Sequence, residues 1–273
     1  SAVEDTLHPD RVVIGATEDF VFNKLEQLHQ PLNAPILKMN PNSAQMAKYT
    51  ANAYLATRIT FINQIANLCE INGADVEEVI KGIGLDQRIG QHYWYPGFGY
   101  GGSCFPKDVK ELAAYSREVG QENNLLNKIN QLNQNRIPKL LNQFEKEVGG
   151  WTDKKVAVLG LSFKPNTDDT REAPAGKAIP ILLEKGAIVS GYDPMAQWLP
   201  EENLNQYTQV ESITQAVKDA DVIMALIEWP EITNFDLSKA KSNQEQWLID
   251  ARNQFSPDKV KNLGFNYLGI GRN

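Results

Sequence analysis

The second half of the chain alternates short apolar segments with helical ones, and this alternation constrains the fold more than any other feature. It begins after Gly149 and Gly150, which mark a boundary. The segments typical of strands are residues 155–159, 187–192, 221–227, 247–250 and 265–270, and those typical of helices are 173–184, 213–220 and 257–262. Short apolar strands between helices indicate a parallel sheet covered on both faces. The sequence therefore predicts an α/β fold, with a Rossmann-like domain over residues 151–273.

The segment before this boundary reads as helical. One long helix is predicted over residues 41–72, with Pro41 or Ser43 able to start it and Asn72-Gly73 ending it. Shorter helices are predicted over residues 75–82, 107–119 and 124–148. At 1.5 Å per residue, a helix of about 30 residues spans about 45 Å, a length that bridges domains or pairs with a copy of itself. We expect an all-helical central region over residues 41–148.

Residues 1–40 read as one βαβ unit, with strands over 11–15 and 35–39 and a helix over 18–28. Two strands do not make an independently stable sheet. We therefore expect the chain to begin partway through a domain.

The charge and composition of the chain argue against several classes of protein. The net charge of −7 argues against broad binding to nucleic acid or to an anionic membrane. No apolar run approaches the ~20 residues of a membrane span, and the first residues lack the pattern of a signal peptide. Two cysteines do not make a disulfide framework. We expect a cytoplasmic protein.

Cys104 lies in a glycine-rich run, residues 97–108, that leads into a helix. Pro106 suits the first turn of that helix, so Cys104 is expected at the helix N-terminus, where the helix dipole favours a thiolate. Lys107 adds a cation and Asp108 a carboxylate near the sulfur. The pattern indicates a nucleophile, although a small packing residue under a turn explains it equally well. Cys69, mid-helix among apolar residues, is expected to be inert packing.

Further candidates lie on the long helix and at predicted strand ends. Lys48 and Asn52 are four residues apart and share a helical face, which is either solvated or turned toward the Cys104 loop. The strand that ends at residue 159 is followed by Gly160 without the rest of a G-x-G-x-x-G fingerprint. Phe163 could stack on a base, Lys164 could contact a phosphate, and Arg252 could clamp an anion. The three histidines show no metal-ligand spacing, so no metal site is expected.

Several of these segments together resemble the UDP-glucose/GDP-mannose dehydrogenase family. The resemblance rests on residues 42–52, 97–109, 160–172, 227–229 and 250–253, in the family's order, and it covers the whole chain. It implies NAD-dependent, four-electron oxidation of the C6 alcohol of a UDP-sugar, UDP-glucose first among the candidates, to a carboxylate. It also implies a homodimer built on the long helix that starts near Pro41.

The resemblance assigns roles to residues. Cys104 would be the nucleophile that forms a thiohemiacetal and then a thioester, Asp108 would help to activate water, and Lys48 and Asn52 would stabilise the alkoxide and oxyanion. The UDP-sugar would contact Tyr95, Phe98, Gly99, Tyr100, Gly101, Phe163, Lys164 and Arg252, and Arg88 would reach the site of a neighbouring subunit. The cofactor NAD would lie near Lys107 and Arg171.

Three features depart from the family pattern. Ile227 stands where members usually carry Thr, and Ala251 stands where they usually carry Gly. The family's N-terminal Rossmann domain, which binds NAD and carries a glycine fingerprint and a catalytic Glu, should precede Ser1. The resemblance therefore implies that residues 1–40 are the last βαβ unit of that domain and that the chain is a C-terminal portion of a longer enzyme. Two alternatives stay open: a related dehydrogenase of GDP-mannose or a UDP-N-acetylhexosamine, and a non-catalytic module that binds a UDP-sugar and dimerises.

Overall fold

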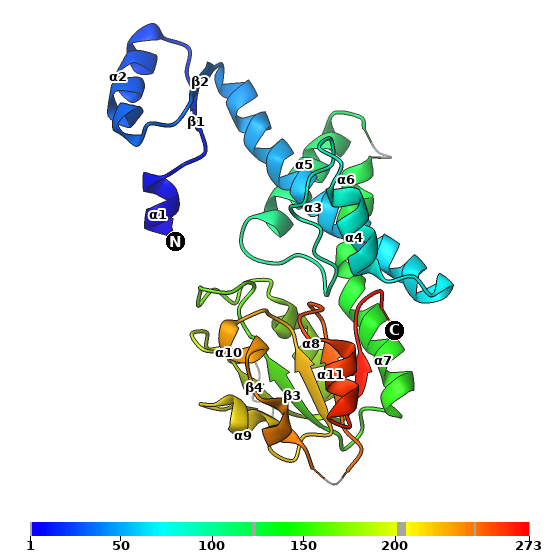
Figure 1. The fold of residues 1–273 in the computed structure, drawn as a ribbon. Coiled ribbons are helices and arrows are strands. Elements are labelled where there is room, and N and C mark those ends of the chain that lie inside the picture. Colours follow the sequence, from blue (N-terminus) through cyan, green and yellow to red (C-terminus); the bar gives the residue numbers. More distant parts are fainter. Residues whose placement is uncertain (1, 122–123, 201–205, 243, 273) are drawn as a thin grey trace. The chain divides into compact units, whose positions relative to one another are not determined.

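The computed structural model describes residues 2–121, 124–200, 206–242 and 244–272. The chain forms two compact units, Ser1–Tyr54 and Leu55–Asn273 (Figure 1). The predicted domain boundaries near residues 40 and 150 remain predictions.

The first unit contains the predicted βαβ arrangement. Its elements are α1 (Ala2–Leu7), β1 (Val12–Gly15), α2 (Asp19–His29), the 3-10 helix η1 (Gln30–Leu32), β2 (Ile36–Met39) and the beginning of α3 (Pro41–Asn72). Strands β1 and β2 pair in parallel, with Val12 opposite Ile36. The side chain of Asn40 accepts a hydrogen bond from the Ser43 N–H at 2.9 Å, so the first turn of α3 is capped by the residue before Pro41.

Helices fill the first part of the second unit. After α3 come α4 (Val76–Gly84), α5 (Phe105–Glu118), α6 (Leu125–Gln134) and α7 (Arg136–Val148). The prediction of one helix over residues 124–148 is wrong, because α6 and α7 are separate helices that meet at Asn135. Pro138 explains the break: it has no N–H to donate to the carbonyl of Gln134, and its ring clashes with that carbonyl.

The rest of the second unit is a six-stranded parallel sheet, which confirms the predicted α/β class. Its strands are β3 (Lys155–Leu159), β4 (Ile188–Tyr192), β5 (Tyr207–Gln209), β6 (Val222–Ala225), β7 (Trp247–Asp250) and β8 (Asn266–Leu268). Strand β5 was not predicted, because it has three residues and no apolar run. The connecting helices are α8 (Pro174–Glu184), α9 (Ile213–Val217), α10 (Pro230–Thr233), the 3-10 helix η2 (Leu237–Ala240) and α11 (Pro257–Asn262).

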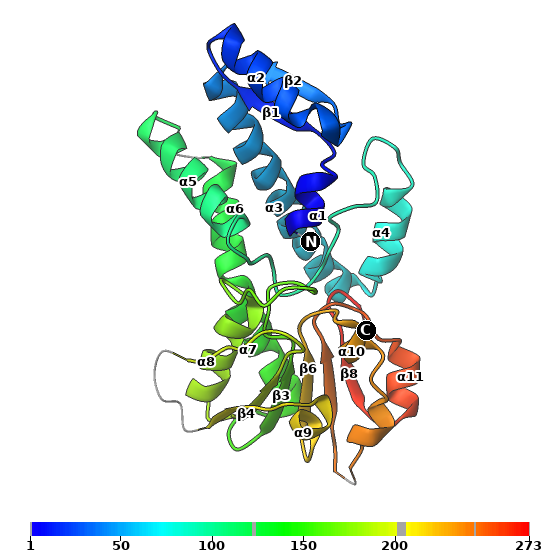
Figure 2. The same ribbon diagram turned by 90° about the vertical axis from the view of Figure 1, so that its left-hand side faces the viewer.

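The strand order is β5-β4-β3-β6-β7-β8. Counted within this sheet it is 3-2-1-4-5-6, the doubly wound Rossmann order. The order in which the chain adds strands therefore reverses between β3 and β6. Open α/β sheets bind ligands at the carboxyl ends of the strands at such a point. Figure 2 shows the sheet with α8 beside β4 and α11 beside β8.

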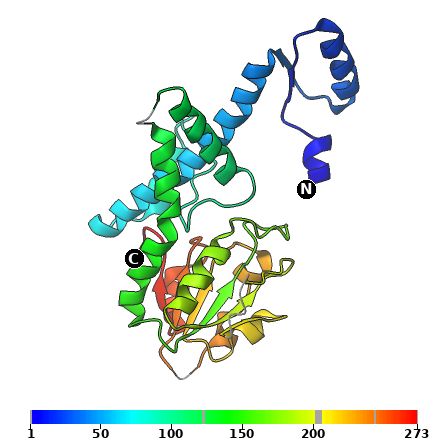
Figure 3. The same cartoon turned by 180° about the vertical axis from the view of Figure 1, so that it is seen from behind.

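One apolar core joins the helices of the second unit to its sheet. Helix α7 packs along α8 (Figure 3). Trp151 is fully buried after α7, and its indole N–H donates to the Leu141 carbonyl at 3.3 Å. Cys69 belongs to the same core, which confirms its predicted packing role, and burial raises the pKa of its thiol. Among the described residues, no helix is long and apolar enough to cross a membrane.

Candidate functional site

Cys104 is the N-cap residue of α5, as predicted. The helix starts at Phe105, Pro106 lies in its first turn, and the Asp108 N–H donates to the Cys104 carbonyl at 2.9 Å. The Cys104 side chain is exposed, and its sulfur lies 3.8 Å from the Ser103 hydroxyl. The thiol is thus accessible to solvent at the N-terminus of a helix.

The glycines before Cys104 allow the loop to pack tightly on the segment that follows β3. A Cβ on Gly101 would lie 2.2 Å from the Glu172 carbonyl oxygen, and one on Gly102 would lie 2.8 Å from two ring carbons of Phe163. The Gly102 N–H also donates to the Arg171 carbonyl at 3.1 Å. The structure therefore brings Cys104, Phe163 and Arg171, three predicted site residues, into one neighbourhood.

Polar side chains from α3 and from the α6–α7 region hold the other end of the loop. Asn133 accepts from the Tyr100 N–H at 2.9 Å and donates to the Tyr100 carbonyl at 3.0 Å. Asn63 accepts from the Gly97 N–H at 2.8 Å, and Arg136 Nε donates to the Gly97 carbonyl at 2.9 Å. Burial lowers the pKa of Arg136 to about 10. The loop backbone is thus fixed by side chains of the second unit.

The aromatic residues of this loop lie in different environments. Phe98 is buried in the core and stacks on Phe144, with 6.4 Å between ring centroids. Tyr100 is buried against the edge of Phe105, and its hydroxyl has no hydrogen-bond partner among the described residues. Burial raises the pKa of Tyr100, so this hydroxyl stays protonated. Tyr95 is exposed.

The charged residues near Cys104 form ion pairs. Lys107 Nζ lies 2.5 Å from the buried carboxylate of Asp108 and 3.4 Å from Glu111, and the hydrogen bond with Asp108 raises the pKa of Lys107. Arg171 binds Asp169 through two hydrogen bonds of 2.9 and 2.7 Å, which lower the pKa of Asp169.

A hollow of about 460 Å³ lies beside this loop. Its lining residues are Gly102, Ser103, Pro106, Lys107, Lys110, Glu111, Arg171 and Glu172. The hollow is thus bordered by the residue before Cys104 and by both residues predicted to lie near the cofactor.

Arg252 lies at the carboxyl end of β7 and was predicted to bind an anion. The anion that it binds in the structure is the carboxylate of Glu228. Arg252 Nε and Nη2 donate to Glu228 at 2.6 and 2.7 Å. Its guanidinium carbon lies 5.8 Å from the centre of the Tyr95 ring. Arg252 thus connects the sheet to the loop that leads to Cys104.

Asp193, at the end of β4, organises the loops around β3. Its Oδ2 accepts from the N–H groups of Leu161 and Ser162 at 2.8 and 2.9 Å, from the Ser162 hydroxyl at 2.9 Å and from the Trp229 indole at 3.2 Å. Its Oδ1 accepts from the N–H groups of Met195 and Ala196 at 2.9 and 2.8 Å. This buried carboxylate therefore ties the loops after β3 and β6 together.

Two predicted binding residues are exposed. Lys164 Nζ lies 5.5 Å from the centre of the Phe163 ring. Arg88 is 88% exposed and pairs with Asp86 at 2.6 Å, and this hydrogen-bonded pairing lowers the pKa of Asp86. Their predicted roles at the substrate stay predictions.

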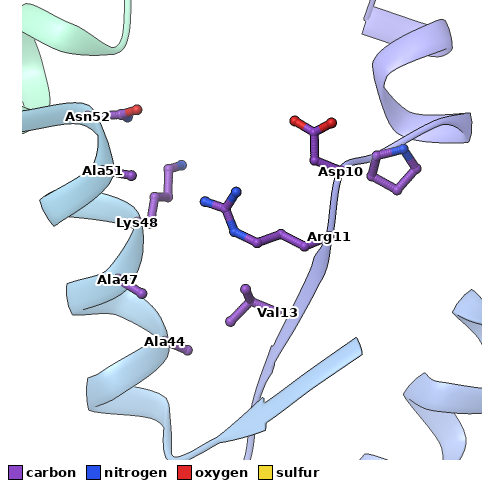
Figure 4. Close-up of a pocket in the computed structure, with 9 residues that line it drawn as sticks. Asp10, Arg11, Val13, Ala44, Ala47, Lys48, Ala51 and Asn52 are labelled. Carbon is purple, nitrogen blue, oxygen red and sulfur yellow. The ribbon is translucent and has the colours of Figure 1, made fainter. Parts of the chain in front are cut away.

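Lys48 and Asn52 belong to the first unit, where they line a hollow of about 430 Å³ with Asp10 and Arg11. Figure 4 shows Lys48 on α3 and Arg11 pointing into this hollow from opposite sides. Their predicted place beside Cys104 remains a prediction.

Sequence reasoning missed the residues that hold the predicted ones in place, namely Asn63, Asn133, Arg136 and Glu228. Glu228 offered one usable signal, a carboxylate directly after a buried strand and before Trp229. The partners of the others are far away in the sequence, so no local pattern reveals them. Within the described residues, no group of three or more His, Cys, Asp or Glu side chains could hold a metal ion.

Sequence profiles of one protein family match the two main parts of the chain. The central domain of the UDP-glucose/GDP-mannose dehydrogenase family matches residues 42–135, and the UDP binding domain of the same family matches residues 157–257.

Individual relatives agree with these matches. UDP-glucose 6-dehydrogenase TuaD of Bacillus subtilis is 42% identical over 276 residues, covering 100% of this chain and 59% of that protein. The Pseudomonas aeruginosa UDP-glucose 6-dehydrogenase is 40% identical over 284 residues, covering 100% of this chain and 62% of that protein. A UDP-glucose dehydrogenase structure from Pyrobaculum islandicum superposes with a TM-score of 0.88 at 32% identity, covering 100% of this chain and 61% of that one. The chain therefore spans about three fifths of the length of its relatives.

Proposed function

Because the chain belongs to the UDP-glucose/GDP-mannose dehydrogenase family, we propose that its protein is a UDP-glucose 6-dehydrogenase, which oxidises the C6 alcohol of UDP-glucose to the carboxylate. One observation carries this proposal. The exposed Cys104 thiol, at a helix N-terminus, lies in a loop that packs against the segment after β3, beside the carboxyl edge of a Rossmann-order sheet.

The chemistry assigns Cys104 a covalent role. Loss of a hydride from C6 and of the hydroxyl proton gives an aldehyde, to which the Cys104 thiolate adds to form a thiohemiacetal. Loss of a second hydride from C6 and of the thiohemiacetal hydroxyl proton gives a thioester. Water then attacks the thioester, which releases the carboxylate and returns the thiol.

NAD⁺ would accept the two hydrides when bound. The residues near Cys104 fit an anionic cofactor in part: Lys107 and Arg171 are cations on the hollow beside Ser103, although both also pair with carboxylates of the protein. The turn after β3, where a Rossmann sheet would hold the pyrophosphate, has Gly160 but not the rest of the G-x-G-x-x-G fingerprint.

Side chains of the second unit would bind the UDP-sugar. Arg252 and Lys164 supply positive charge for the diphosphate, and Phe163 and Tyr95 supply aromatic faces for the base. The buried Tyr100 hydroxyl lacks a partner among the described residues, and a sugar hydroxyl would satisfy it. Asp108, Lys48 and Asn52 keep the roles in water activation and oxyanion stabilisation that the family resemblance gives them.

A homodimer built on α3 is part of the proposal. Phe61, Leu68 and Ile71 lie on this helix and are 53%, 57% and 82% exposed. Phe61 and Leu68 are seven residues apart and therefore share a helical face. A second copy of the helix would cover such an apolar face, and Arg88 would then reach the partner's site. We also propose the cytoplasm as the location.

Nucleotide-dependent turnover tests the proposal. The full-length protein is incubated with NAD⁺ and UDP-glucose, GDP-mannose or a UDP-N-acetylhexosamine, and NADH and the uronate are measured. We expect two NADH per UDP-glucose and no uronate from Cys104→Ser. Uronate formation by Cys104→Ser would refute the covalent role, and turnover of another sugar nucleotide alone would reassign the substrate. Binding of UDP without any turnover would favour the non-catalytic module.

A further inference from the structure

Glu228 and Arg252 form a two-pronged ion pair at the carboxyl edge of the sheet. Arg252 Nε donates to Glu228 Oε2 at 2.6 Å and Nη2 donates to Oε1 at 2.7 Å. The Arg252 and Glu228 side chains are 21% and 29% exposed. Burial alone would raise the pKa of Glu228, but the hydrogen bonds and charge of Arg252 hold it below its ordinary value. The pair is therefore ionised and has a fixed geometry.

Neighbouring strands place the two residues. Glu228 follows β6 and Arg252 follows β7, and these strands pair with Ala225 opposite Asp250. The Arg252 N–H donates to Asp250 Oδ1 at 3.2 Å, while Asp250 Oδ2 accepts from the Phe255 N–H at 2.7 Å. The backbone beneath the pair is thus held by the sheet.

The free edge of Arg252 lies toward the loop that leads to Cys104. Glu228 occupies Nε and Nη2. The third nitrogen, Nη1, would lie 3.7 Å from a Cβ on Gly97, and the Tyr95 ring centre is 5.8 Å from the guanidinium carbon. A ligand between the strand ends and this loop would meet Nη1 without displacing Glu228.

We propose that Glu228 is a positioning residue, which fixes Arg252 so that Nη1 faces the diphosphate of a bound nucleotide. The inference rests on the proposed function, because it takes Arg252 as a contact of the UDP-sugar. A long arginine side chain loses rotamer freedom when it binds a ligand, and an arginine already held in place loses less. Glu228 therefore strengthens binding through Arg252, although its own charge repels the diphosphate.

Calorimetric titration with UDP tests this role. We expect Glu228→Gln to weaken UDP binding about tenfold and Arg252→Ala to weaken it at least as much. The double variant should bind no more weakly than Arg252→Ala alone, because Glu228 acts only through Arg252. A role in general stability would instead lower affinity by the same factor in both backgrounds.

Glu145→Gln provides a matched control. Glu145 pairs with Lys185 at 2.6 Å, and these side chains are 31% and 29% exposed, which is close to the values for Glu228 and Arg252. This pair joins α7 to α8 and contains none of the proposed binding residues. Its variant should keep the wild-type affinity for UDP.

Each result of these titrations either supports or overturns the inference about Glu228. Unchanged or tighter UDP binding by Glu228→Gln, or additive losses in the double variant, would overturn the inference while leaving the proposed function intact. A wild-type protein that does not bind UDP would overturn the proposed function, and the inference with it. If Glu228→Gln does not fold, Arg252→Lys keeps the charge but cannot form the paired hydrogen bonds. Arg252→Lys should also bind UDP about tenfold more weakly than the wild type, and wild-type affinity in that variant would overturn the inference.

Discussion

Replacing Gly102 by alanine should destabilise the second unit through two separate effects. Gly102 has φ = +82°, a conformation that costs an L-residue about 1–2 kcal/mol, partly offset by about 0.4–1 kcal/mol from a stiffer unfolded chain. The new Cβ would also lie 2.8 Å from two ring carbons of Phe163, an overpacking that costs about 1–3 kcal/mol. We therefore expect Gly102→Ala to lower the free energy of unfolding by about 2–4 kcal/mol.

Gly120 allows the two effects to be separated. Its φ is +84°, but a Cβ there would meet nothing within 4 Å. Gly120→Ala should therefore cost only the backbone effect, about 1 kcal/mol. In Phe163→Ala the ring is absent, so adding Gly102→Ala to that variant should also cost about 1 kcal/mol.

Urea unfolding followed by tryptophan fluorescence measures these free energies. All five tryptophans lie after residue 54, so the signal reports on the second unit alone. Equal losses in Gly102→Ala and Gly120→Ala, within about 0.5 kcal/mol, would refute the contact between the Cys104 loop and Phe163.

Three further predictions concern reactivity, acid stability and assembly. A thiol reagent should modify exposed Cys104 quickly and buried Cys69 slowly, and Cys104→Ser should remove the fast phase; a fast phase that survives would contradict this placement. The lowered pKa of Glu228 stabilises the fold above the unfolded pKa of about 4.5, and this contribution is lost as the pH falls through the lower folded pKa. The urea midpoint of Glu228→Gln should thus fall less than that of the wild type on acidification, and parallel curves would disprove the contribution. Sedimentation should show a dimer that Leu68→Glu dissociates and that the control Tyr115→Glu, at a similarly exposed position, does not; a dimeric Leu68→Glu would exclude this face.

Local features of the site could be predicted from the sequence. Pro106 and the glycines before Cys104 locate the start of α5, because both residue types act through their own backbone geometry. The strands β3, β4, β6, β7 and β8 also carry a local signal, because each lies within one of the short apolar segments predicted to be strands. Pro138 is a local signal for the break between α6 and α7, and the prediction of one helix over residues 124–148 overlooked it.

Long-range pairings could not be predicted. Arg252 was expected to bind an anion, yet its partner Glu228 is 24 residues away and becomes its neighbour only because β6 pairs with β7. The glycine-rich run before Cys104 is visible in the sequence, but Phe163 and Glu172, the residues on which Gly101 and Gly102 pack, follow a distant strand. Such contacts depend on strand order, which a single sequence does not contain.

The carboxylate of Asp193 occupies the backbone N–H groups that this Rossmann-order sheet presents after β3. The N–H groups of Leu161 and Ser162, in the turn where dinucleotide-binding sheets receive a pyrophosphate, already donate to it. A carboxylate attached to the same sheet competes with a free phosphate at a high effective concentration. Because Asp193 already accepts from these N–H groups, a nucleotide at this sheet would have to be held by side-chain cations beyond this turn, and Lys164 and Arg252 are the ones we propose.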